Sequence, residues 1–199
     1  MEWYEGEVQA LERQREENPP PPEVVAFYGS SSIRLWSTLA DDFPEVPVLN
    51  LGFGGSTLTA CVHYFERLVP PCHPKVLLCY AGENDIGDGR SVDAIVGSFR
   101  ELHQKVDRDL GPISFAYLSI KPSPLRWSAI DKIREVNARI RQEIRTRPES
   151  LFIDIHTPML DDHGQPRREL WTEDGIHMSR EGYHVWWQVV SAHRRRLGF

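Results

Sequence analysis

The sequence predicts a three-layer α/β/α domain built on a five-stranded parallel sheet, and two features of the chain lead to this fold class. Five compact apolar runs show little alternation between apolar and polar residues, which is typical of strands buried on both faces. A stretch with helical periodicity separates each run from the next, as right-handed crossovers between parallel strands require. The chain has 199 residues, 40% of them hydrophobic, which is enough for one large domain with a single core.

The elements can be assigned in order along the chain. Residues 2–17 carry a few apolar side chains among many charged ones, which predicts a short amphipathic helix. The prolines at 19–22 form a stiff spacer, so we divide the chain into an N-terminal helix and spacer, 1–22, and a single domain, 23–199. The predicted strands are Val24–Tyr28, Val46–Leu51, Val76–Ala81, Ile113–Ile120 and Leu151–Ile155. The predicted helices are 33–42, 57–68, 91–109, 128–146 and 180–197.

Composition narrows the classes of partner. The chain has 23 basic and 29 acidic residues and a net charge of −6, which argues against nucleic acid as a partner. The basic run 193–196 is interpreted as a solvated last helical turn. Cys61, Cys72 and Cys79 have no paired spacing and fit a reducing compartment. We find no signal-like or membrane-spanning run and expect a cytoplasmic protein, monomeric or homodimeric. Its N-terminal helix could fold back on its own domain or dock on a neighbouring molecule, and its few apolar residues slightly favour the first.

In open parallel sheets, ligands bind in the crevice beyond the carboxyl ends of the strands. The segments that follow the predicted strands are therefore where a site is expected, and each is rich in glycine or polar residues. In chain order they are Gly29-Ser30-Ser31-Ser32, Gly52-Phe53-Gly54-Gly55-Ser56-Thr57, Gly82-Glu83-Asn84-Asp85, Lys121-Pro122-Ser123-Pro124 and, before the last helix, Asp174-Gly175-Ile176-His177.

These segments contain the parts of a serine hydrolase. Asp174 and His177 are three positions apart, which lets the carboxylate orient the imidazole as a general base. The serines at 30–32 offer a hydroxyl nucleophile, and the residues alone do not decide which of them reacts. Gly54-Gly55 and Asn84 could supply oxyanion donors. Structural readings remain open beside these: helix capping for the serines and Asp174, a tight turn for the glycines and an Asx turn for Asn84.

Two other kinds of site are disfavoured. A metal site could be imagined from His156, Asp161, Asp162 and His163, but their spacing matches no known ligand motif. The glycines at 52–55 suggest a dinucleotide loop, yet the third glycine of that motif would fall at Thr57, and no Walker sequence is present. We therefore predict neither a metal nor another cofactor.

Taken in order, the segments resemble the four sequence blocks of the SGNH (GDSL-like) hydrolases, over about residues 24–197. The matching residues are Phe27 to Ser32, Asn50 to Gly55, Gly82 to Asp85 and Asp174 to His177. The chain is most similar to the small flavodoxin-like esterases related to the platelet-activating-factor acetylhydrolase catalytic subunits. It departs from the pattern at Ser30, where the family usually has Asp.

The resemblance implies a role for each matching residue. Ser31 would be the nucleophile, His177 the base and then the acid, and Asp174 the residue that orients His177. The backbone N–H groups of Ser31 and Gly55 and the side chain of Asn84 would form the oxyanion hole. The implied reaction is ester hydrolysis through an acyl-enzyme.

Substrate preference is less clear from the sequence. The candidate contact residues are Phe53, Lys121, Arg126, Trp127 and Trp171, with Ile86 beside them. Because few residues are available for a lid, we expect a short acyl group such as acetyl on a small-molecule ester. The alternatives are a catalytically impaired carbohydrate-binding or scaffold protein of the same fold and, less favoured, a nucleotide-binding module.

Overall fold

The computed structural model describes residues 1–145 and 147–199, and its core is a five-stranded sheet with the strand order β2-β1-β3-β4-β5. Every neighbouring pair of strands is parallel. The strands are β1 Val25–Gly29, β2 Val48–Gly52, β3 Val76–Tyr80, β4 Ser114–Leu118 and β5 Ser150–Ile153. Each predicted strand is present with its ends within two residues of the predicted ones, and the predicted fold class is confirmed.

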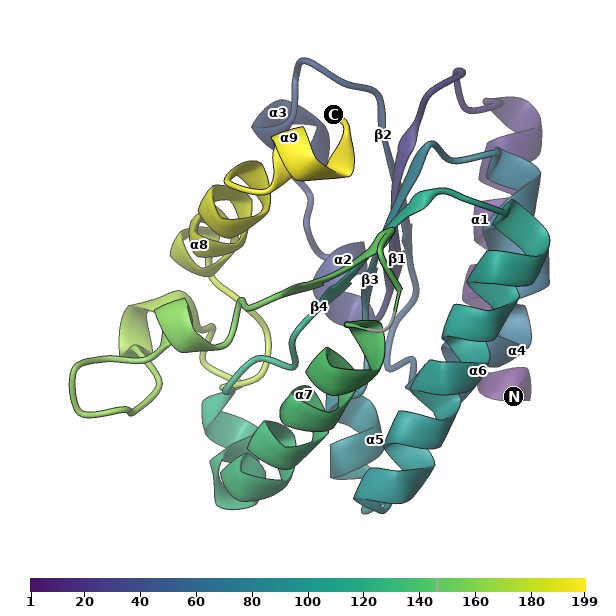
Figure 1. Cartoon of the computed structure of the whole chain (residues 1–199). Coiled ribbons are helices and arrows are strands. Elements are labelled where there is room, and N and C mark those ends of the chain that lie inside the picture. Colours follow the sequence, from purple (N-terminus) through teal and green to yellow (C-terminus); the bar gives the residue numbers. More distant parts are fainter. Residues whose placement is uncertain (146) are drawn as a thin grey trace.

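Helices cover both faces of the sheet (Figure 1). The α-helices are α1 Glu2–Glu17, α2 Ser31–Arg34, α3 Leu39–Asp42, α4 Leu58–Leu68, α5 Glu83–Gly87, α6 Val92–Leu110, α7 Ile130–Ile144, α8 Arg180–Ser191 and α9 Arg194–Leu197. Short 3-10 turns are η1 Pro70–Cys72, η2 Pro124–Ala129, η3 Thr157–Met159 and η4 Arg168–Leu170. Side chains of α4, α6 and α7 form one hydrophobic cluster, and those of α2, α3 and α8 form the other. The sheet is thus buried on both faces, as its unalternated apolar strands require.

Three predicted helices differ from the structure. The predicted helix 33–42 is split into α2 and α3, because Trp36 Nε1 and the Thr38 hydroxyl both donate to one oxygen of Asp42 at 2.7 Å and close the connection. The predicted helix 180–197 is likewise split into α8 and α9. The helix predicted at 128–146 starts as the turn η2 and continues as α7, and residue 146 lies outside the described residues.

Helix α1 packs on α4 of the domain. Val8 is fully buried between them. Arg67 of α4 donates to the carboxylates of Glu5 and Glu12 at 2.6 to 3.0 Å, and Arg15 donates to the Arg67 carbonyl at 2.8 Å. The segment 1–22 is therefore attached along most of its helix to the fold that it precedes. Nowhere in 1–145 or 147–199 is a helix long and apolar enough to cross a membrane.

The buried imidazole of His103 makes stability sensitive to acid. Its ring is 3% exposed and stacks on Phe115, and its Nε2 lies 2.6 Å from the Ser150 hydroxyl. Burial, with a smaller contribution from the charge of Arg147, lowers the pKa of His103 to about 4. In the unfolded chain this histidine has an ordinary pKa of about 6.5, so the unfolded state takes up the proton first as the pH falls. The stability that the folded protein gains from its neutral, buried His103 is therefore fully present above about pH 6.5 and is lost toward about pH 4.

We expect the free energy of unfolding of the native chain to fall by up to about 3 kcal/mol between pH 6.5 and pH 4 through His103. Urea unfolding at several pH values measures it. The variant His103→Gln should show a flatter pH dependence, whereas His184→Gln, which alters an exposed histidine of α8, should keep that of the wild type. Equal slopes for wild type and His103→Gln would contradict the assignment.

Candidate active site

Ser31 stands at the first turn of α2, directly beyond the carboxyl end of β1, which lies between β2 and β3 in the sheet. Gly29 has a φ of +138°, and a Cβ there would lie 1.9 Å from the Tyr80 carbonyl oxygen, so the strand can turn into α2 only at a glycine. Ser30 is the N-cap residue, and its N–H donates to the Tyr80 carbonyl at 2.9 Å. The Ser30 side chain accepts no capping hydrogen bond from the described N–H groups at the start of α2. Ser31 is therefore free of a capping role and only half-buried.

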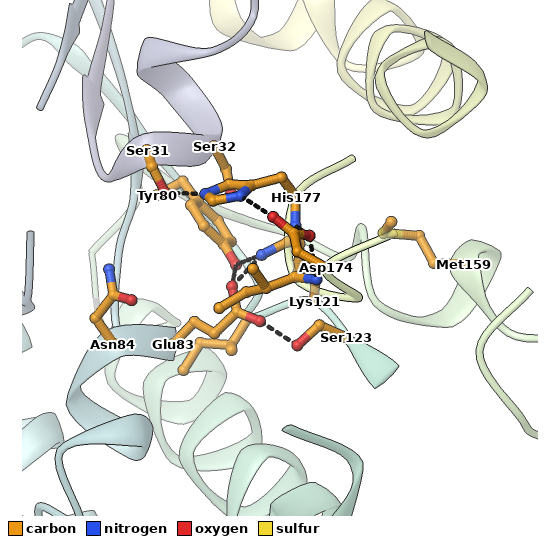
Figure 2. Close-up of polar contacts among 12 residues, drawn as sticks. Ser31, Ser32, Tyr80, Glu83, Asn84, Lys121, Ser123, Met159, Asp174 and His177 are labelled. Atoms are coloured by element: carbon orange, nitrogen blue, oxygen red, sulfur yellow. Dashed lines mark hydrogen bonds and ion pairs between the residues drawn. The ribbon is translucent and has the colours of Figure 1, made fainter. Parts of the chain in front are cut away.

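His177 lies against Ser31 and Asp174 (Figure 2). Its Nε2 is 3.1 Å from Ser31 Oγ, and its Nδ1 is 2.6 Å from Asp174 Oδ2. Because a carboxylate only accepts, Nδ1 carries the proton, which leaves Nε2 as an acceptor for the Ser31 hydroxyl. The three side chains form a continuous hydrogen-bonded chain in which Nε2 can take the serine proton.

Asp174 is held in its ionised form. Partial burial acts to raise the pKa of Asp174, but the backbone N–H groups of His177 and Ile176, the imidazole and the Thr172 hydroxyl all donate to the carboxylate. These bonds outweigh burial and set the pKa well below its usual range. An ionised Asp174 favours the Nδ1–H form of His177 and stabilises the imidazolium that follows proton uptake.

The segment that carries His177 is held in a turn by hydrogen bonds between its own two ends. The Thr172 N–H donates to the His177 carbonyl at 2.9 Å, and Trp171 pairs with Met178 in an antiparallel bridge. Ser179 caps α8, since its hydroxyl accepts from the Gly182 N–H at 3.2 Å. The capping role that remained open for Asp174 thus belongs to Ser179.

The second loop, residues 53–57, is called the oxyanion loop below. Gly55 has a φ of +67°, a left-handed conformation that favours glycine. The Gly54 N–H donates to Glu7 Oε2 at 2.8 Å, and the Tyr4 hydroxyl donates to the Gly55 carbonyl at 3.2 Å. Both partners belong to α1. The N–H of Gly54 is therefore already engaged, and that of Gly55 is the candidate oxyanion donor.

Asn84 belongs to the short helix α5, which follows β3. Its Nδ2 donates to the Ser56 carbonyl at 3.0 Å, which fixes the amide against the oxyanion loop. In Figure 2, Asn84 and Ser31 lie on the same side of the His177 ring, and Asp174 lies on the other. An amide N–H in this place can donate to an oxygen beside Ser31.

Asp85 is a residue whose structural role was not predicted from the sequence. Its Oδ2 accepts from the N–H of Leu58 at the start of α4 at 2.8 Å, and its Oδ1 accepts from Arg90 at 2.7 Å. Burial, partly offset by these bonds, raises the pKa of Asp85. The fully buried carboxylate ties α5 to the end of the oxyanion loop.

A buried polar cluster lies beneath the triad and corrects one prediction. Lys121, expected to contact substrate, is fully buried and pairs with the carboxylate of Glu83. The same carboxylate accepts from the Tyr80 hydroxyl at 3.1 Å and from Ser123. Lys121 Nζ also faces the ring of Trp171, 5.9 Å from its centroid. Lys121 therefore stabilises the packing beneath the site, between α5, which carries Asn84, and the segment that carries His177. Its side chain does not line the surface of the site.

We expect Lys121→Met to lower the free energy of unfolding by about 3 kcal/mol, because the Glu83 charge would stay buried without its cation. Urea denaturation measures this loss. Adding Glu83→Gln to the Lys121→Met chain should restore part of the stability, since a neutral amide can still bond to Tyr80 and Ser123. A single variant as stable as the wild type would contradict the role given to the pair.

The remaining predicted contact residues fall in different places. Phe53 is fully buried against Tyr4, Tyr28 and Tyr64, so its side chain belongs to the core and the prediction that it contacts substrate is corrected. Ile86 is also buried. Arg126 packs against the backbone of Gly87 at the end of α5.

Trp127 and Trp171 line a cavity of about 680 Å³ that borders the His177 segment. The other lining residues are Pro124, Gln165, Pro166, Arg168, Thr172, Glu173 and Gly175. Aromatic faces and polar groups therefore stand together beside Asp174. The four residues weighed as a metal cluster do not form one: across 1–145 and 147–199, no group of three histidine, cysteine, aspartate or glutamate side chains is placed to share an ion.

The sequence profile of the GDSL-like lipase/acylhydrolase family matches residues 23–185. No curated protein matches the chain in sequence.

Solved structures share the fold. A candidate platelet activating factor from Streptococcus pneumonia superposes with a TM-score of 0.85 at 19% identity, covering 96% of this chain and 92% of that one. A GDSL-like lipase from Bacteroides thetaiotaomicron superposes with a TM-score of 0.80 at 21% identity, covering 95% of this chain and 98% of that one. A family 3 carbohydrate esterase from Clostridium thermocellum superposes with a TM-score of 0.69 at 15% identity, covering 87% of this chain and 98% of that one. At these identities the likeness concerns the fold.

Proposed function

Because this chain belongs to the GDSL-like lipase/acylhydrolase family and is a carboxylic ester hydrolase, we propose that it hydrolyses short-chain, acetyl-type esters with Ser31 as nucleophile. The observation that carries the proposal is the hydrogen-bonded chain from Ser31 Oγ through His177 to Asp174, at 3.1 and 2.6 Å. These residues come from loops at the same edge of the sheet, and all three types are those that acyl transfer needs.

The proposed reaction has two steps. His177 Nε2 accepts the hydroxyl proton as Ser31 Oγ attacks the acyl carbon, and the N–H groups of Ser31 and Gly55 with the Asn84 amide stabilise the oxyanion. The imidazolium then gives its proton to the departing alcohol, which leaves an acyl group on Ser31. Water, activated by His177 in the same way, releases the acid and restores the serine hydroxyl.

A short acyl group is favoured by the surface. The large apolar side chains that stand exposed in the described residues are Met1, Trp3, Leu35 and Leu125. A long acyl chain would need a continuous apolar groove, whereas the lining of the cavity beside the His177 segment includes the polar and charged residues Gln165, Arg168 and Glu173. One structure of related fold is an acetyl esterase mutant with an acetate ion, which agrees with a small acyl group.

A polar, ring-bearing alcohol is favoured by the cavity beside the His177 segment. His177 must protonate the leaving oxygen, so the alcohol lies on the side of this imidazole. The cavity there offers Trp127 and Trp171 as flat apolar walls and Arg168 and Gln165 as hydrogen-bonding groups. Such a lining suits an acetylated sugar or a similar polyol.

Initial rates on p-nitrophenyl acetate, butyrate, octanoate and dodecanoate test the proposal. We expect the highest kcat/KM on acetate or butyrate and a decline with longer chains. Rates that rise steadily from two to twelve carbons would overturn the short-chain assignment. Acetic acid release from an acetylated sugar, compared with hexyl acetate, then tests the alcohol: equal kcat/KM on the two would contradict a polar alcohol site.

A further inference from the structure

The N-terminal end of α1 contacts the two loops that carry the proposed nucleophile and oxyanion donors. Glu7 uses one carboxylate oxygen to accept the Gly54 N–H at 2.8 Å, and the other lies 3.5 Å from a guanidinium nitrogen of Arg34. Arg34 is in α2, the helix that begins with Ser31. Glu7 thus joins the oxyanion loop to the nucleophile helix.

The approach of Glu7 depends on a glycine. A Cβ at Gly54 would lie 2.9 Å from Glu7 Oε1 and 3.3 Å from the Arg34 guanidinium. A larger residue would have to push these side chains away. The loop, α1 and α2 are therefore packed as tightly here as their backbones allow.

Tyr4 holds the loop at a second point. Its hydroxyl donates to the Gly55 carbonyl at 3.2 Å, and its ring packs edge-on against Phe53 at 5.6 Å and Tyr64 at 6.3 Å. Glu7 fixes the peptide group before the 54–55 peptide, and Tyr4 fixes the one after it. The intervening peptide, which carries the Gly55 N–H, is held from both sides.

We propose that the N-terminal end of α1 belongs to the catalytic apparatus, with Glu7 and Tyr4 as positioning residues that hold the Gly55 N–H toward Ser31. This inference rests on the proposed function of Gly55 as an oxyanion donor. The profile match to the family begins at residue 23, so the contribution comes from outside the matched segment. Misplacing an oxyanion donor slows the chemical step and leaves substrate binding nearly unchanged.

Steady-state kinetics on p-nitrophenyl acetate test the catalytic part. We expect Glu7→Ala to lower kcat by about tenfold, with KM changed by less than about twofold. Glu7→Gln should retain most of kcat, because its amide oxygen still accepts the Gly54 N–H, and Tyr4→Phe should show a loss in kcat alone. The control Glu12→Gln weakens the docking of the same helix on Arg67 without touching the loop, so it should keep the wild-type kcat. Wild-type kcat in Glu7→Ala, or an equal loss in Glu12→Gln, would overturn the proposal.

Amide hydrogen exchange tests the positioning part without using activity. Peptides that cover 53–58 should exchange about tenfold faster in Glu7→Ala than in the wild type, and at the wild-type rate in Glu12→Gln. Unchanged exchange in Glu7→Ala would overturn the inference. A third outcome is faster exchange in Glu7→Ala together with ester turnover that does not depend on Ser31. This outcome would show that the proposed function is wrong and would overturn the catalytic role of α1, which would then hold the loop for another purpose.

Discussion

Replacing Ser31 with alanine is expected to lower turnover of p-nitrophenyl acetate by about 10⁴-fold or more. The variant lacks the hydroxyl oxygen that, in the proposed mechanism, attacks the acyl carbon and passes its proton to His177 Nε2, which stands 3.1 Å away. Burst kinetics and labelling by a fluorophosphonate probe measure the loss. Both should vanish while the thermal midpoint stays near that of the wild type, because Ser31 is half-buried and caps nothing.

Two neighbours provide matched controls. Ser30 and Ser32 flank the nucleophile and are both buried. Ser30→Ala and Ser32→Ala should keep burst acylation. A dead Ser30→Ala beside an active Ser31→Ala would place the nucleophile one residue earlier and overturn the assignment.

Asn84→Ala is expected to lower kcat by about a hundredfold or more, as loss of one oxyanion donor does, with little change in KM. The structure fixes this amide against the Ser56 carbonyl at 3.0 Å, so it is already in place before the substrate arrives. Steady-state kinetics on p-nitrophenyl acetate separate the two parameters.

The matched control is Asp88→Ala, which removes an exposed carboxylate at the other end of α5. It should leave kcat within about twofold of the wild type, as surface changes away from a site do. If Asn84→Ala turns over at the wild-type rate, Asn84 is not an oxyanion donor.

Much of the fold could be predicted from the sequence because it depends on long, repeated signals. The strands Val25–Gly29 and Val76–Tyr80 are buried along their whole length, and burial on both faces leaves an apolar run that no exposed strand would show. The proximity of the candidate site segments was predictable for a related reason. Parallel strands bring their carboxyl ends to one edge, so segments such as those of Ser31 and His177 meet although they are far apart in the chain.

The errors come from residues whose environment depends on tertiary packing. Lys121 reads as a surface cation because buried lysines are rare, and only the structure reveals Glu83 as its buried partner. Phe53 stands in a glycine-rich loop, where exposure is the default expectation, yet the end of α1 covers it with Tyr4. The breaks in the helices predicted at 33–42 and 180–197 depend on side-chain bonds that periodicity does not contain.

The distance along the chain between the nucleophile and its base has a consequence for how the protein is made. Ser31 and His177 are 146 positions apart, so during synthesis the hydroxyl is made long before the imidazole that would act as its base. Closing so long a loop costs chain entropy, which the packing of the segment that carries His177 must offset. A nascent chain that holds its central strands without this segment therefore carries Ser31 without the base that the proposed mechanism requires.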